Sequence, residues 1–211
     1  MSKKVVFYYV RHGETLYNKD HIIQGGRVDS ELAPQAYPVL DETAQALNKI
    51  KLAACYCSPL PRAVASAKRL IQSLDLPIKK MDNLAEFDFG ELDGKPYKRN
   101  RRAFVHCFMQ QDFSEVGGET GEQVRRRARK AFKKMYQQAH SGDSILVVGH
   151  GAYLRSVLRE FSEMTKTSRL LTSLTMRVPN GSITTIVGQN SEILVTQMPQ
   201  RAKNFFPTFA G

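Results

Sequence analysis

The chain has 211 residues, 42% of them apolar, and a formal net charge of +11. This length and apolar content argue against a disordered chain and predict a packed globule, with residues 1–211 forming a single domain. The positive charge favours an anionic partner, such as a phosphorylated metabolite, nucleic acid or an acidic surface, but does not choose among these.

The location of the protein is predicted from what the sequence lacks. No apolar run approaches the roughly 18 residues that a membrane span needs. The six apolar residues after Met-Ser-Lys-Lys are short for a signal sequence and suit a first strand. Three cysteines argue against a disulfide framework, and Cys55 and Cys57 have no further metal ligands nearby, so they are expected to be buried thiols. We therefore predict a cytoplasmic protein.

The first predicted element is a strand over residues 5–10. Its residues Val-Val-Phe-Tyr-Tyr-Val are all apolar or aromatic, which is typical of a strand buried on both faces inside a parallel sheet. The run stops at Arg11-His12-Gly13. Because ligands of open α/β sheets bind at the carboxyl ends of strands, Arg11 and His12 are candidate site residues.

An irregular segment is expected to follow as far as Pro38. Asn18 lies near its start, and Gly25-Gly26 would break any helix. Apolar residues at helical spacing then predict a helix over residues 41–52.

The second strand is predicted over residues 54–57 and ends in Ser58-Pro59-Leu60-Pro61-Arg62. Proline suits the first position of a helix, so a helix over 61–73 would carry Arg62 in its first turn. A helix N-terminus favours anions, and a guanidinium offers a planar fork to phosphate oxygens. A surface cation is the plainer interpretation of Arg62.

A short third strand is predicted over residues 77–80, and an acidic segment over 84–94 follows it. Four carboxylates alternate there with aromatic residues and glycines: Glu86, Asp88, Glu91 and Asp93. Such a cluster could supply a general acid, but the spacing does not say which carboxylate, and an exposed acidic loop is the alternative.

Two basic helices are predicted over residues 97–112 and 120–139, and their charges are interpreted as solvated faces. A strand over 145–148 then ends in Gly149-His150-Gly151, which repeats the histidine–glycine strand end. Parallel strands in one sheet would bring both histidines to the same edge.

The last predicted elements are a helix over 152–161 and two strands, over 182–187 and 193–197, antiparallel to each other. The tail over 199–211 carries three phenylalanines. It would dock either on the body of the protein or on a second subunit, so a homodimer is an open alternative.

If the candidate residues at the strand ends lie close together, they predict a site for phosphoryl transfer. Arg11, Arg62 and the two histidines would form an oxyanion pocket, and the Walker lysine motif and an obvious set of metal ligands are both missing from the sequence. A histidine can act as a nucleophile, and neighbouring arginines disfavour its protonated form. One acid from the 84–94 segment would protonate the leaving group.

Six segments, in order, resemble the signature of the histidine phosphatase superfamily, in its first, phosphoglycerate-mutase-like branch. They are Arg11-His12-Gly13-Glu14-Thr15 with Asn18 and Gln24-Gly25, then Ser58 to Ala63, Leu84 to Gly94, Gly117-Gly118-Glu119-Thr120, Val148-Gly149-His150-Gly151 and Pro179-Asn180-Gly181-Ser182. The resemblance spans residues 5 to 187.

The resemblance implies an α/β fold, a three-layer α/β/α sandwich with a mostly parallel central sheet. It implies that His12 is the phosphorylated nucleophile, Glu86 the proton donor, and Arg11, Arg62 and His150 the ligands of the phosphoryl oxygens. The residues assigned to substrate binding are Asn18, Gln24, Gly25 and Gly151. Neither a metal nor another cofactor is implied.

The predicted function is hydrolysis of a small phosphomonoester, with two alternatives. A cofactor-dependent phosphoglycerate mutase is disfavoured because the chain has no tryptophan and lacks the family's Arg-x-Tyr-Gly run. A non-catalytic phosphate- or nucleic-acid-binding module is motivated by the basic helices, but the aromatic interleaving of single-strand binders is absent. Residues 32–36, Leu-Ala-Pro-Gln-Ala, stand where members of the family often have Leu-Thr-x-x-Gly. The rim of the substrate pocket is therefore expected to differ from that of other members.

Overall fold

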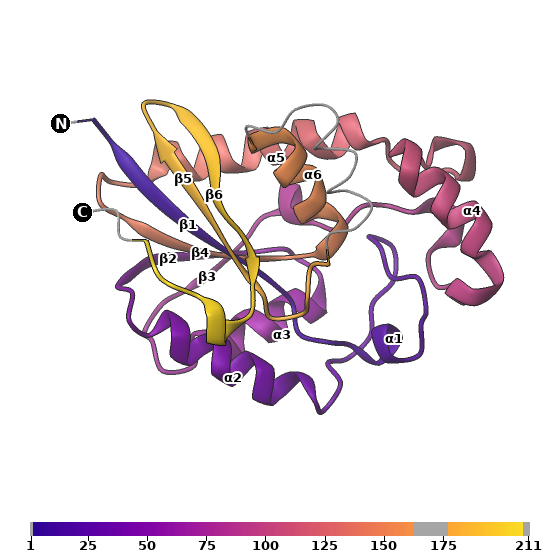
Figure 1. Cartoon of the computed structure of the whole chain (residues 1–211), viewed down its shortest axis with the longest axis horizontal. Helices are drawn as coiled ribbons and strands as arrows, with labels where there is room; N and C mark the ends of the chain where they lie inside the picture. The colour runs from indigo at the N-terminus through magenta and orange to yellow at the C-terminus, as the bar shows by residue number, and fades with distance from the viewer. Residues whose placement is uncertain (1, 163–176, 209–211) are drawn as a thin grey trace.

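The computed structural model describes residues 2–162 and 177–208, and a six-stranded sheet lies at its centre (Figure 1). The strands are β1 (Lys4–Arg11), β2 (Leu52–Cys57), β3 (Ile78–Lys80), β4 (Ser144–Gly149), β5 (Ile183–Gln189) and β6 (Glu192–Gln200). Their order is β3-β2-β4-β1-β5-β6. The first four strands are parallel, whereas β5 is antiparallel to both β1 and β6. The predicted mostly parallel sheet is therefore confirmed.

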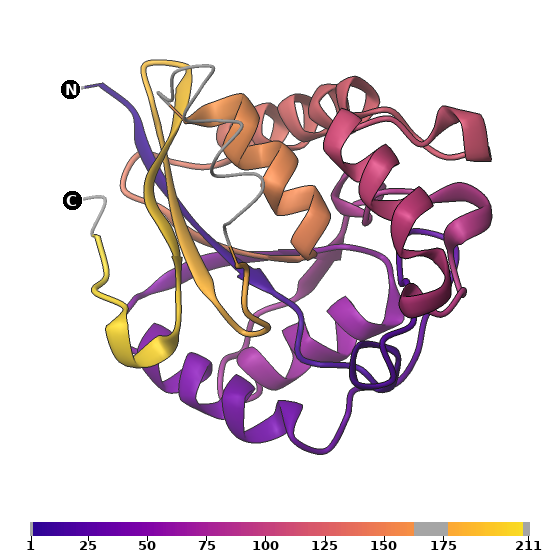
Figure 2. The ribbon, with the colours of Figure 1, turned by 45° about the vertical axis from the view of Figure 1, so that its right-hand side comes forward.

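Helices cover both faces of this sheet. The α-helices in the described part of the chain are α1 (Leu16–Lys19), α2 (Ala36–Leu47), α3 (Pro61–Leu70), α4 (Tyr97–Gln110), α5 (Gly121–Gln138) and α6 (Gly151–Phe161). Figures 1 and 2 show α2 and α3 on one face and α5 and α6 on the other, which makes the three layers of an α/β/α sandwich. The helices α1 and α4 lie on the side toward which β1 points (Figure 1).

Strand β1 explains why two separate apolar cores form. Successive side chains of a strand point to opposite faces. Val5, Phe7 and Tyr9 therefore join the core under α5 and α6, and the alternate residues join the core over α2 and α3. Phe7 packs edge-on against Phe132 of α5, with ring centroids 5.4 Å apart. The unbroken apolar run of the sequence thus reflects burial on both faces, as predicted.

One predicted helix is displaced. It was expected over residues 41–52 but spans Ala36–Leu47, so the irregular segment ends at Gln35. Pro38 lies in the first turn, where a missing N–H breaks no helical hydrogen bond. The apolar residues near the other end belong to the turn before β2 and to β2 itself, which begins at Leu52. The helix predicted over 61–73 also ends early, at Leu70.

The cysteines lie in the core, and the described part of the C-terminal tail packs against the sheet. Cys55 and Cys57 are buried free thiols that face the same core, as predicted. Phe205 is buried edge-on against Tyr8 of β1, with centroids 5.8 Å apart, whereas Phe206 is 75% exposed. Phe209 lies outside the described residues.

Within residues 2–162 and 177–208, no helix is both long and apolar enough to cross a membrane. That residues 1–211 form one domain stays a prediction.

We predict that Phe132→Ala lowers the free energy of unfolding by about 3–5 kcal/mol, because it removes a fully buried ring and leaves a cavity between α5 and the sheet. Urea unfolding followed by circular dichroism measures this loss. The matched control is Phe206→Ala, which changes an exposed ring and should cost less than about 0.5 kcal/mol. Equal losses in the two variants would contradict the described core.

Candidate active site

Two histidines meet at one edge of the sheet. The strands β1 and β4 are parallel neighbours with Arg11 opposite Gly149, so the next residues, His12 and His150, leave the sheet side by side. Their ring centroids lie 5.1 Å apart, and both side chains are buried, at 3% and 0% exposed. The backbone N–H of His12 donates to the Gly149 carbonyl at 2.9 Å. The repeated strand end in the sequence predicted this placement.

His12 is a neutral imidazole with one nitrogen unused. Its Nδ1 lies 2.7 Å from the carbonyl oxygen of Gly13. A carbonyl can only accept, so Nδ1 carries the proton and the lone pair lies on Nε2. Burial, and then the positive charges of Arg62 and Arg11, hold the pKa of His12 well below its usual 6.5. The sequence predicted the effect of the arginines; burial is the larger cause.

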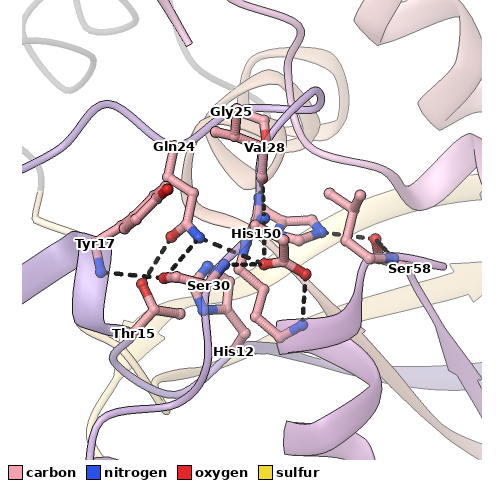
Figure 3. Close-up of polar contacts among 12 residues, drawn as sticks. His12, Thr15, Tyr17, Gln24, Gly25, Val28, Ser30, Ser58 and His150 are labelled. Carbon is pink, nitrogen blue, oxygen red and sulfur yellow. Dashed lines mark hydrogen bonds and ion pairs between the residues drawn. The ribbon is translucent and has the colours of Figure 1, made fainter. Parts of the chain in front are cut away.

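His150 is held through both its ring and its backbone. Its Nε2 lies 2.7 Å from the hydroxyl of Ser58, which follows β2 (Figure 3). The phenol of Tyr9 accepts from the backbone N–H of His150 and donates to its carbonyl at 3.0 Å. The Nδ1 atom is buried and has no hydrogen-bond partner within residues 2–162 and 177–208. Burial, followed by the charge of Arg62, lowers the pKa of His150 well below 6.5.

Arg62 is buried in the first turn of α3, at 1% exposed, so its interpretation as a surface cation is wrong. One terminal nitrogen, Nη1, donates to the Val28 carbonyl at 3.0 Å and to Asp29 Oδ1 at 2.9 Å. The other, Nη2, donates to the Gly25 carbonyl at 2.9 Å. Its Nε is buried without a partner. The arginine therefore ties the loop of residues 24–30 to α3 and keeps its Nε–H available to a ligand.

Arg11 resembles Arg62 in leaving its Nε unpaired. Its Nη1 donates to the Val178 carbonyl, and its Nε is buried without a hydrogen-bond partner. Burial lowers the pKa of Arg11, and the nearby Glu86 carboxylate opposes that shift. A side chain at Gly151 would place its Cβ 3.1 Å from this Nε, so the glycine leaves room beside the guanidinium.

Glu86 is the one carboxylate of the acidic segment that reaches the end of β4. Its Oε1 accepts from the N–H groups of Phe87 at 2.8 Å and Tyr153 at 2.7 Å, and its Oε2 accepts from Ala152 at 3.0 Å. The last two donors lie in the first turn of α6, directly after His150. The carboxyl group is therefore fixed to the same strand end as the second histidine.

The other acids of this segment have different partners. Asp88 forms an ion pair with Arg27 at 2.7 Å. Asp93 accepts from the N–H groups of Gly25 at 2.6 Å and Arg27 at 3.1 Å, and burial raises its pKa to about 6. Glu91 is exposed. These contacts link the acidic segment to the 24–30 loop, and they single out Glu86 from the four acids that the spacing left open.

The side chains assigned to substrate binding hold this loop against the start of α1. Gln24 accepts from the Thr15 hydroxyl at 2.7 Å and donates to Ser30 Oγ at 3.1 Å (Figure 3). Asn18 Oδ1 accepts from the Thr15 N–H and from the amide of Asn180, both at 3.3 Å. Gln24 and Asn18 are thus used within the protein, and their contact with a substrate stays a prediction.

Sequence reasoning missed three partners of the predicted residues. Asp29 pairs with Arg62, Ser58 contacts His150, and Asn180 donates from its Nδ2 to the His12 carbonyl at 3.0 Å. The position of Ser58 at the carboxyl end of β2 was a usable signal; nothing local marked Asp29. In the described part of the chain, no group of three or more His, Cys, Asp or Glu side chains is arranged to hold a metal ion.

Known proteins share this arrangement of strands and helices. The crystal structure of phosphoglycerate mutase from Bacillus anthracis superposes with a TM-score of 0.77 and 24% identity, covering 93% of each chain. The fold is therefore phosphoglycerate-mutase-like. The family model of the histidine phosphatase superfamily (branch 1) matches residues 7–199. The chain belongs to this family.

Curated relatives carry phosphatase names. The uncharacterized phosphatase PhoE of Bacillus subtilis is 30% identical over 153 residues, which are 72% of this chain and 75% of PhoE. The fructose-2,6-bisphosphatase TIGAR of Mus musculus is 31% identical over 163 residues, which are 72% of this chain and 60% of TIGAR. Across the relatives compared, the chain spans between 47% and 75% of their length.

We predict that the protein loses stability in mild acid because His12 and His150 are buried and neutral. Their folded pKa values lie well below 6.5, so between pH 7.5 and 5.5 these two rings bind protons in the unfolded chain that they do not bind in the folded chain, and the raised pKa of Asp93 offsets only part of this. The free energy of unfolding should fall by about 1 kcal/mol for each histidine over that interval. Urea titrations at the two pH values measure it. In His150→Asn the fall should be smaller by that share, and an unchanged fall would contradict the assignment.

Proposed function

We propose that this chain is a phosphatase that hydrolyses small phosphomonoesters through a phosphohistidine on His12. The observation that carries the proposal is the state of His12, which is neutral with Nδ1 donating to the Gly13 carbonyl and Nε2 unused. Around it, Arg11, Arg62 and His150 each keep one buried ring or guanidinium nitrogen that has no hydrogen-bond partner among the residues that the structure describes. Buried polar atoms of this kind are costly unless a ligand satisfies them, and a phosphoryl group supplies the acceptors.

In the first step, Nε2 of His12 attacks phosphorus, and the bond to the ester oxygen breaks. The imidazole becomes positively charged as the P–N bond forms, and the Gly13 carbonyl stabilises it by accepting from Nδ1–H at 2.7 Å. Arg11 and Arg62 neutralise the phosphoryl oxygens. Glu86 gives its proton to the leaving alkoxide.

His150 supplies a neutral donor to the same phosphoryl group. The Ser58 hydroxyl lies 2.7 Å from Nε2 of His150 and can donate its one proton to that nitrogen while it accepts from the Leu60 N–H at 3.3 Å. With Nε2 accepting, the proton of the neutral ring lies on Nδ1, the buried atom without a protein partner. That N–H is then free to donate to a phosphoryl oxygen.

In the second step, water attacks the phosphohistidine, and the P–N bond breaks to release inorganic phosphate. Glu86, now a carboxylate, takes a proton from this water and is ready for another turnover. Both steps balance without another reactant, and the net reaction is hydrolysis of the ester.

The relatives support a phosphatase over the two alternatives. PhoE and TIGAR are named as phosphatases, and they align with 72% of this chain. The likeness to the Bacillus anthracis mutase, at 24% identity, concerns the fold. The proposed substrates are small phosphomonoesters as a class. A cytoplasmic location stays a prediction from the sequence, and a homodimer stays an open alternative.

We predict that His12→Ala reduces turnover of 4-nitrophenyl phosphate on the order of 10³-fold or more, because the variant has no nucleophile. Treatment with EDTA should leave the parent rate unchanged. The matched control is His140→Ala, which changes an exposed histidine in the turn before β4, at the end of that strand opposite to His150, and should keep the parent rate. Phosphate release over time measures all three.

Turnover retained in a folded His12→Ala protein would contradict the mechanism. Interconversion of monophosphoglycerates that requires a bisphosphorylated primer would instead identify a mutase. No hydrolysis of any phosphate ester, with tight salt-sensitive binding of nucleic acid, would favour the binding module.

A further inference from the structure

One arginine in the basic run of α5 does not belong to a solvated face. The side chain of Arg127 is only 15% exposed, and all its N–H groups are paired within the protein. Its Nη1 donates to the carbonyls of Asn83 at 3.2 Å and Ala85 at 2.6 Å. Its Nη2 donates to the Glu86 carbonyl at 3.0 Å and to Glu119 Oε2 at 3.0 Å, and its Nε donates to Glu119 Oε1 at 3.0 Å.

Glu119 holds the backbone that follows Glu86 in the chain. Its Oε2 accepts from the backbone N–H of Asp88 at 3.0 Å, and its own N–H donates to the Asp88 carbonyl at 2.9 Å. The neighbouring Gly118 lies so close that a Cβ there would clash with the same Asp88 carbonyl. Arg127 and Glu119 together therefore hold the backbone before, at and after Glu86.

The carboxyl group of Glu86 is fixed from the opposite side. Its two oxygens accept from the N–H groups of Ala152 and Tyr153 at the start of α6. The guanidinium of Arg127 also lies over the ring of Tyr153, 5.0 Å from its centroid. Arg127 and Glu119 therefore hold the backbone around Glu86, and the first turn of α6 holds its side chain.

We propose that Arg127, with Glu119, is a positioning residue that places Glu86 for proton transfer to the leaving group. The inference depends on the proposed function, in which Glu86 is the proton donor. Every N–H of Arg127 is directed to a loop carbonyl or to Glu119, so none is left for a phosphoryl oxygen. Loss of Arg127 should therefore slow proton transfer to the leaving group without removing a contact to the phosphoryl group.

The test compares leaving groups. An alkoxide needs a proton in order to leave, whereas 4-nitrophenolate leaves without one, so misplacement of Glu86 penalises alkyl phosphates selectively. We expect Arg127→Met to lower kcat/KM, which reports the step in which the leaving group departs, about 10²-fold for an alkyl phosphate and less than about tenfold for 4-nitrophenyl phosphate. Arg127→Lys should show the same selectivity, because an ammonium cannot reproduce the planar fork. The matched control is Arg129→Met, which removes ion pairs to Glu122 and Glu160 and should alter neither rate.

Glu86→Gln, measured beside these variants, separates the two proposals. If Glu86→Gln lowers kcat/KM selectively for the alkyl phosphate and Arg127→Met lowers kcat/KM equally for both substrates, the positioning role is overturned. If Glu86→Gln is not selective, the proton donor itself is wrong. Should Arg127→Met fail to fold, Glu119→Gln decides, because it weakens the same contacts through one side chain. Selectivity there supports the inference, and equal slowing overturns it.

Discussion

The parallel pairing of β1 with β4 is the constraint on which the rest of the site depends. Arg11 lies opposite Gly149 in that register, so the residues that follow each strand emerge together. A shift of one residue would turn every side chain of β1 to the other face, and Phe7 and Tyr8 would exchange cores. The helices packed on both faces therefore fix the histidine pair through the register, and the reactive groups lie where the carboxyl ends of the strands place them.

Two of the arginines around the site are each paired with one carboxylate. Burying a guanidinium is costly unless it is paired. Arg62 has Asp29 at 2.9 Å, and Arg127 has Glu119 at 3.0 Å, each with backbone carbonyls in addition. The Nε atoms of Arg62 and Arg11 are buried with no hydrogen-bond partner among the described residues, and burial beside these cations keeps His12 neutral. A site organised in this way attracts an oxyanion and presents it to an uncharged nucleophile.

The sequence predicted the parts that depend on local patterns. Apolar runs ending in Arg11-His12 and Gly149-His150 located two strands and their shared edge, and the proline at the start of α3 located Arg62. Contacts between loops distant in sequence had no such signal, so the partners Asp29 and Glu119 were not found. Pro38 was interpreted as lying before the helix, although a first turn accepts it, and α2 was therefore displaced. The roles of the site residues themselves stay proposals.

The most direct measurement asks which atom carries the phosphoryl group during turnover. Protein mixed with substrate and quenched in alkali preserves phosphohistidine, and its ³¹P NMR spectrum distinguishes the two ring positions. Because Nδ1 of His12 donates to the Gly13 carbonyl, the account predicts phosphorylation of His12 at Nε2. Phosphate on Nδ1, on another residue, or on no residue during active turnover would contradict it.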